Sequence, residues 1–154
     1  MISESQYFGK YANHPDATAE RRFHATVMLD IVNNLLETAA ADGCELPENP
    51  NTGNQISGNG NGGFRPQNSQ VGAGSSKHKD GRAVDIFDPK RQFASWCLAH
   101  PDELTKRGLH MEDPRWTPTW LHLQDVPPGS GKLVFIPSSD PPLAAAPAAW
   151  ETLG

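Results

Sequence analysis

The high content of glycine and proline constrains the fold of this chain more than any other feature of its sequence. The chain has 154 residues, of which 14 are glycine and 14 are proline. Both residue types interrupt regular secondary structure, so this composition excludes a helical bundle or a coiled coil and favours a fold rich in loops. The length suits one domain, and with only 36% hydrophobic residues its core must be small.

Hydrophobic periodicity predicts one long helix over residues 17–41, with Asp16 as its N-cap and Gly43 just past its end. The next stretch, 45–63, has few large apolar groups and is predicted to form a long loop with at most a short strand at 55–57. The apolar stripe of the helix is predicted to comprise Phe23, Val27, Met28, Ile31, Val32, Leu35, Leu36 and Ala39.

The rest of the chain alternates between short strands and short helices. Strands are predicted over 83–87, 109–112, 120–123 and 133–136. Between the first two we expect helices over 89–100 and 101–106, the first capped by Asp88. This order predicts an α+β fold with a small, mostly antiparallel sheet and flanking helices. Residues 1–136 are predicted to form one domain, and the Pro/Ala-rich stretch 137–154 a C-terminal tail.

Charge and hydropathy argue against two classes of partner. The formal net charge of −5 is unfavourable for non-specific binding to nucleic acid or to anionic lipid. No apolar run approaches the roughly 20 residues that cross a bilayer, and residues 1–10 lack the basic and apolar regions of a signal peptide. We therefore expect synthesis in the cytoplasm, no nucleic-acid partner and no membrane partner.

The two cysteines, Cys44 and Cys97, do not form a metal-binding motif. We expect two free thiols, as is usual in a reducing compartment, with a single disulfide as the alternative.

Two histidines and one aspartate have the spacing of a metal site. His78 is predicted in a loop and Asp85 on the strand that follows, with Gly81 allowing a sharp turn between them. His122 lies in the alternating stretch 120–124, on the face that does not carry the leucines. Two imidazoles and a carboxylate leave one position of a tetrahedral Zn²⁺ open, as in catalytic sites, where the pKa of a bound water falls toward neutrality. The alternative is that all three are ordinary polar groups.

The same segment resembles the M15 family of zinc peptidases, which includes D-Ala-D-Ala carboxypeptidases and phage L-alanyl-D-glutamate endopeptidases. Residues 76–85 match the family signature S-x-H-x-x-G-x-A-x-D, and residues 120–122 resemble its final W-x-H. Residues 57–58 and 63–66 resemble its SG-(Y/F)R strand, interrupted here by a Gly/Asn insertion. The resemblance covers residues 56–124, less than half of the chain.

This resemblance implies a hedgehog/D-Ala-D-Ala-peptidase-like fold and a Zn²⁺ ion bound by His78, Asp85 and His122. It further implies hydrolysis of an amide bond in the peptide part of bacterial peptidoglycan, by an endopeptidase or a D,D-carboxypeptidase. A small chain without a signal peptide would suit a phage-encoded endolysin, which reaches the cell wall during lysis, or an enzyme associated with phage virion components.

The resemblance also implies residues for catalysis. Arg65 would lie in the cleft, where its guanidinium binds or polarises the substrate. The acidic residue that many family members carry three positions before the last histidine is replaced by Thr119, which cannot act as a base. Glu112 is therefore the predicted general base, with Asp113 as the alternative, because a turn through 114–118 can return either one to the metal.

Three further residues are predicted to support or contact the substrate. Ser76 would support the loop or donate a hydrogen bond near the substrate, His110 would orient the substrate or stabilise an oxyanion, and Trp120 would line a groove unless it belongs to the core. An excess of basic over acidic residues near the motif favours an anionic substrate. The basic residues are Lys77, Lys79, Arg82, Lys90 and Arg91.

Two other functions remain open from the sequence. The first is a non-catalytic, zinc-stabilised module that binds the cell wall or belongs to a virion, which the threonine at 119 favours. The second is a cytoplasmic D-Ala-D-Ala dipeptidase in which the loop over 45–63 forms a lid.

Overall fold

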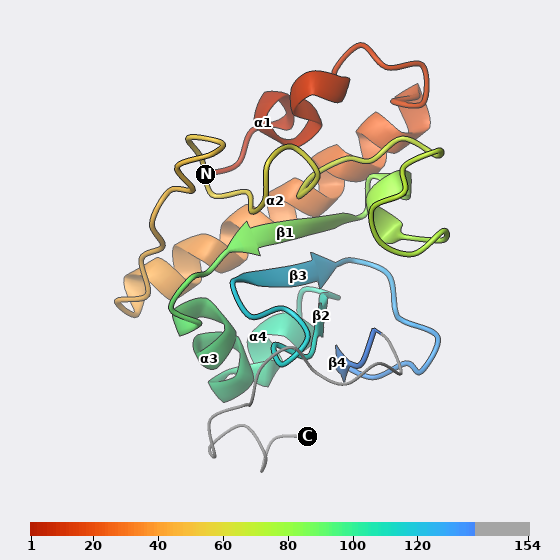
Figure 1. The fold of residues 1–154 in the computed structure, drawn as a ribbon. Coiled ribbons are helices and arrows are strands. Elements are labelled where there is room, and N and C mark those ends of the chain that lie inside the picture. The colour runs from red at the N-terminus through yellow and green to blue at the C-terminus, as the bar shows by residue number, and fades with distance from the viewer. Residues whose placement is uncertain (138–154) are drawn as a thin grey trace.

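Four short strands form a single mixed sheet in the order β1-β3-β2-β4 (Figure 1). The strands are β1 (Ala83–Phe87), β2 (His110–Glu112), β3 (Trp120–Gln124) and β4 (Val134–Phe135). Strand β3 pairs antiparallel with β1 and β2, whereas β4 pairs parallel with β2. The computed structural model describes residues 1–137, so all but the first residue of the predicted tail lie outside it. The predicted α+β class is confirmed, and each strand lies within a residue or two of its predicted place.

Alternation along the strands divides the sheet into an apolar face and a polar face. Val84 pairs with Leu123 and Ile86 with Leu121 in the β1–β3 register, and all four side chains are buried. On the other face, Asp85 lies directly opposite His122. Because successive side chains of a strand point to opposite faces, the same register that closes the core also gathers polar groups.

Helix α2 (Ala19–Ala41) runs alongside β1 and shares one hydrophobic core with the apolar face of the sheet (Figure 1). Its N-cap is Thr18, whose side chain accepts from the Arg21 amide, rather than the predicted Asp16. The buried residues of the helix are Ala25, Met28, Leu29, Val32, Leu35, Leu36 and Ala39.

Two residues of the predicted stripe, Phe23 and Val27, are instead 65% and 40% exposed. A row at four-residue intervals advances about 40° around the helix at each step, because one turn takes 3.6 residues. A row that starts at Phe23 on the solvent side therefore reaches the core only near Leu35.

The other helices are short. They are α1 (Glu4–Phe8), η1 (Gly9–Tyr11), η2 (Lys77–Asp80), α3 (Gln92–Ala99) and α4 (Pro101–Thr105). Helix α3 begins later than predicted, at Gln92, so its N-cap is Arg91 rather than Asp88. The Asp88 carboxylate nevertheless accepts from the Phe93 and Ala94 amides of the first turn at 3.1 and 2.8 Å. Among residues 1–137, no helix has the length and apolar character needed to cross a membrane.

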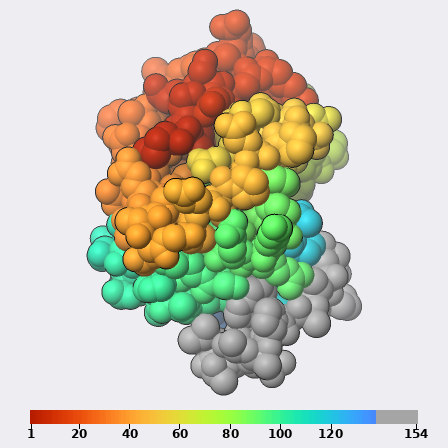
Figure 2. Space-filling model, turned by 90° about the vertical axis from the view of Figure 1, so that its left-hand side faces the viewer, coloured from red at the N-terminus to blue at the C-terminus, as the bar shows by residue number. Residues whose placement is uncertain are grey.

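The stretch 45–63 is a long loop, as predicted, and the expected strand at 55–57 is reduced to a single bridge between Ile56 and Ile86. The space-filling view shows this loop against the N-terminal segment (Figure 2), where the Tyr11 hydroxyl donates to Asn61 at 3.2 Å. Cys44 and Cys97 are free thiols, as predicted.

Two truncations in α2 test which face of the helix is buried. Leu35→Ala should lower the free energy of unfolding by about 2–5 kcal/mol, because it leaves a cavity in the core. Phe23→Ala should change it by less than about 1 kcal/mol, because that ring is mostly in solvent. Urea denaturation of both variants in the presence of a chelator measures the difference; similar losses would show that the helix is rotated from the orientation described.

Candidate metal centre

Three elements converge to bring His78, Asp85 and His122 together. Asp85 on β1 and His122 on β3 are register partners, and η2 carries His78 above the start of β1. Gly81 ends η2 with a φ of 73°. A β-carbon at this position would collide with the Arg21 carbonyl oxygen, so glycine permits both the turn and the close approach to α2.

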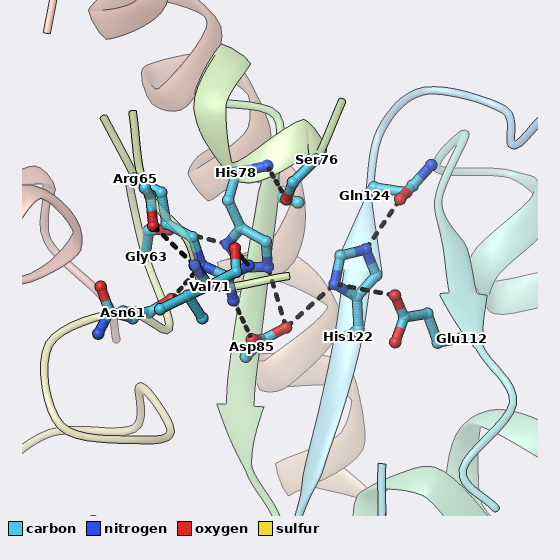
Figure 3. Close-up of polar contacts among 12 residues, drawn as sticks. Asn61, Gly63, Arg65, Val71, Ser76, His78, Asp85, Glu112, His122 and Gln124 are labelled. Carbon is cyan, nitrogen blue, oxygen red and sulfur yellow. Dashed lines mark hydrogen bonds and ion pairs between the residues drawn. The ribbon is translucent and has the colours of Figure 1, made fainter. Parts of the chain in front are cut away.

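The three side chains meet at one carboxylate oxygen (Figure 3). His78 Nε2 lies 3.2 Å and His122 Nδ1 lies 3.0 Å from Asp85 Oδ1. The possible ligand atoms all lie within 4.8 Å of one another, and the side chains are only 2%, 11% and 7% exposed in chain order. The structure thus brings the three predicted ligands into a buried group that could hold a metal ion.

The second nitrogen of each ring has its own acceptor. His78 Nδ1 lies 2.8 Å from the Gly63 carbonyl oxygen, and His122 Nε2 lies 2.8 Å from Gln124 Oε1. Because these oxygens can only accept, the outer nitrogens carry hydrogen. In a neutral ring the inner nitrogen then directs a lone pair at Asp85, so a proton or a cation must lie between them.

The pKa values agree with a site that balances positive charge against Asp85. Burial lowers the pKa of His78 by disfavouring its charged form. Burial acts in the same direction on His122, but its hydrogen bond to Asp85 and the charge of Glu112 outweigh burial and raise its pKa to about 9. Burial acts to raise the pKa of Asp85, yet the two histidines hold it well below its usual range. A divalent cation would supply the charge that a proton on His122 supplies in the free chain.

Glu112 is the acidic residue that the structure brings to this group. Its Oε1 lies 3.8 Å from His122 Nδ1, and burial raises its pKa. Asp113 is instead held by Arg115, whose Nη2 lies 2.7 Å from Asp113 Oδ2 and whose backbone amide donates to Oδ1. The structure therefore places Glu112, and not the alternative Asp113, beside the three ligands.

Arg65 contacts the outer oxygen of the central carboxylate. Its Nη2 donates to Asp85 Oδ2 at 3.2 Å, while Nε donates to the Asn61 carbonyl at 2.7 Å and Nη1 to the Val71 carbonyl at 3.4 Å. The guanidinium thus orients Asp85 through the carboxylate oxygen that the two histidines do not contact. A contact between Arg65 and substrate remains a prediction.

The remaining predicted residues lie around this group. Ser76 caps η2 by accepting from the His78 amide at 3.3 Å, which is a supporting role. His110 Nδ1 lies 3.0 Å from the Lys132 carbonyl, and Trp120 is half-buried opposite Phe87. Within residues 1–137, no hydrogen bond joins His110 or Trp120 to the three ligands.

Four of the five basic residues that favour an anionic substrate have partners inside the chain. Lys77 lies 3.9 Å from Asp80, and Arg91 donates to the Pro118 carbonyl at 3.2 Å. Lys79 is buried, and its ammonium donates to the Gln67 and Gly74 carbonyls at 2.8 and 3.2 Å. Arg82 pairs with Asp125 at 2.9 Å. The preference for an anionic substrate therefore remains a prediction, and these four residues support it less than their charges suggest.

The sequence analysis assigned no role to two residues of the site, namely Gln124 and Gly63, although Gly63 lies within the motif-like stretch 63–66. Strand alternation places Gln124 on the face of His122, which is the one signal available for it. Gly63 contributes only a backbone carbonyl, so no side-chain pattern could have indicated it.

Comparisons with protein-family models, with curated proteins and with solved structures each found no match. The resemblance to the M15 family therefore rests on the short motifs described above.

Zinc titration tests whether these residues form a metal site. At a free Zn²⁺ concentration 100 times its Kd, the wild-type chain should gain about 2.7 kcal/mol in free energy of unfolding, because the folded state binds the ion and the unfolded state does not. His78→Ala and His122→Ala should lose this gain, whereas His110→Ala, on the neighbouring strand, should keep it. Chemical denaturation with and without Zn²⁺ measures the effect; equal gains in all four chains would place the binding site elsewhere.

Proposed function

We propose that this chain is a zinc-dependent hydrolase that cleaves an amide bond in the peptide part of bacterial peptidoglycan, as an endopeptidase or a D,D-carboxypeptidase. The observation that carries the proposal is the meeting of His78, Asp85 and His122, with Glu112 beside them. The motif resemblance supplies the substrate class, the hedgehog/D-Ala-D-Ala-peptidase-like fold and a phage-encoded enzyme acting during lysis or from a virion.

Zinc is the metal that best suits these donors. Two imidazole nitrogens and one carboxylate oxygen are a donor set of catalytic zinc sites, in which the fourth position is left for water or substrate. When bound, the ion would polarise the amide carbonyl and lower the pKa of a water molecule at that position. Calcium and magnesium fit less well, because they prefer oxygen donors.

Glu112 is proposed to move the proton. Hydrolysis joins the water oxygen to the amide carbon and breaks the carbon–nitrogen bond. Glu112 accepts one proton from the water and passes it to the departing nitrogen, so the atoms and charges balance. Its position next to His122 and its raised pKa suit this exchange. Glu112 thereby takes the role for which Thr119 has no suitable group.

Arg65 is proposed to hold the Asp85 carboxylate and to bind the substrate. Its bond to Asp85 Oδ2 holds that carboxylate in place and offsets its charge. Three of its five N–H donors face Asn61, Val71 and Asp85, so a contact with an anionic group of the substrate would use the second N–H of Nη1 or Nη2.

A second candidate function is a non-catalytic, zinc-stabilised module that binds the cell wall or belongs to a virion. Two observations favour it. Thr119 replaces the usual acid, and the three predicted ligands are at most 11% exposed, which leaves little open surface at which a substrate could reach them.

A turbidity assay on purified peptidoglycan separates the two candidates. An endopeptidase should clear the suspension, whereas a D,D-carboxypeptidase should release D-alanine without clearing it; either activity should stop when a chelator is added and resume when Zn²⁺ is restored. Mass spectrometry of the products should show new amino termini from an endopeptidase or released D-alanine from a carboxypeptidase. A zinc-loaded chain that sediments with peptidoglycan but releases no fragments would contradict the hydrolase and support the binding module.

Glu112→Gln tests the proton-transfer role. This variant should keep its zinc and lose turnover by a factor of about 10²–10⁴, because glutamine cannot accept the proton. Asp113→Asn is the matched control, because it removes the neighbouring charge, which is held by Arg115. Its turnover and its zinc content should both stay close to those of the wild type. The reverse pattern, with zinc content unchanged in both variants, would assign the base to Asp113.

A further inference from the structure

Gln124 is a buried polar residue that the proposed reaction does not use. It is the last residue of β3, is 4% exposed and lies on the same face as His122. Its register partner on β1 is Ala83, which is also fully buried. The small methyl group of Ala83 leaves space for the longer amide side chain to extend along this face.

The amide of Gln124 can face only one way. Its Nε2 donates to the Val126 carbonyl at 2.8 Å. Because a carbonyl oxygen accepts and never donates, the NH₂ end must point at Val126. The opposite end, Oε1, then points at His122 Nε2, which lies 2.8 Å away.

This orientation determines which nitrogen of His122 is available to a metal. Gln124 Oε1 can only accept, so His122 Nε2 must carry hydrogen. In the neutral ring the lone pair then lies on Nδ1, the atom that is 3.0 Å from Asp85 Oδ1. A hydrogen-bond chain from the Val126 carbonyl through the Gln124 amide thus directs the His122 lone pair into the site.

His78 receives the same kind of support with the ring reversed. Its Nδ1 faces the Gly63 carbonyl, which leaves Nε2 for the site. That support comes from the backbone, whereas the support of His122 comes from one replaceable side chain.

We propose that Gln124 is a positioning residue that selects Nδ1 of His122 as the metal-binding atom and tightens metal binding. The inference rests on the metal-binding part of the proposed function and not on hydrolysis. Acceptors that orient a metal-binding histidine in this way commonly change metal affinity by a factor of about 10–100.

Three variants measure the contribution to affinity. Gln124→Met keeps the length of the side chain but removes the acceptor, so its Kd for Zn²⁺ should rise by about 10–100-fold. Gln124→Glu keeps the acceptor toward His122 and loses the donor toward Val126, so it should bind Zn²⁺ more tightly than Gln124→Met. Gln92→Met is the matched control, because Gln92 donates to the Glu45 carbonyl at the surface, and its Kd should equal that of wild type.

Nitrogen NMR of the chain labelled with ¹⁵N-histidine and loaded with ¹¹³Cd²⁺ identifies the bound atoms. In the wild type, cadmium should couple to Nδ1 of His122 and to Nε2 of His78. In Gln124→Met, the coupling to His122 should weaken or move to Nε2, while the His78 coupling stays. A merely structural role for Gln124 would lower stability without changing which nitrogen couples.

The outcomes separate this inference from the function on which it rests. A wild-type chain that binds neither Zn²⁺ nor Cd²⁺ would overturn both. A wild-type chain that binds Cd²⁺ through Nε2 of His122 would overturn the role of Gln124 alone, without need of any variant. The role of Gln124 would also fall if Gln124→Met bound Zn²⁺ as tightly as wild type with the Nδ1 coupling intact.

Discussion

The meeting of two imidazoles at one oxygen, Asp85 Oδ1, is the interaction on which the rest of the site depends. A buried carboxylate is costly unless it is paired, and here His78 and His122 face one oxygen while Arg65 holds the other. The β1–β3 register, the turn at Gly81 and the close approach of η2 to α2 all serve to keep these groups together. Loss of the carboxylate would leave two buried rings and a guanidinium without their shared partner.

The surroundings of the titratable groups shift their pKa values in different directions. Burial lowers the pKa of His78, whereas the hydrogen bond to Asp85 and the charge of Glu112 raise that of His122, although both rings face the same oxygen. Glu112 comes from β2, whereas the W-x-H motif begins β3, and burial raises the pKa of Glu112. Because the register places β2 beside β3, the structure brings Glu112 next to His122, and the side chain of Thr119 carries no acidic group.

Much of this arrangement could be predicted from the sequence, because short-range patterns determine it. Alternation of apolar and polar residues located the strands and the face of His122, and the motif spacing indicated the three residues that the structure brings together. The buried face of α2 was harder to predict, because apolar residues such as Phe23 also occur on the side of the helix that faces solvent. The sequence already favoured Glu112 over Asp113, and the structure adds the contact that holds Asp113 at Arg115. The amide orientation of Gln124 depends on a backbone carbonyl that no side-chain pattern reveals.

Anomalous diffraction at the zinc absorption edge, from crystals of the chain grown with Zn²⁺, tests the central claim most directly. The account predicts a single strong peak within coordination distance of His78 Nε2, Asp85 and His122 Nδ1. Well-ordered side chains with Asp85 still bridging the two imidazoles, and with no peak between them, would contradict it.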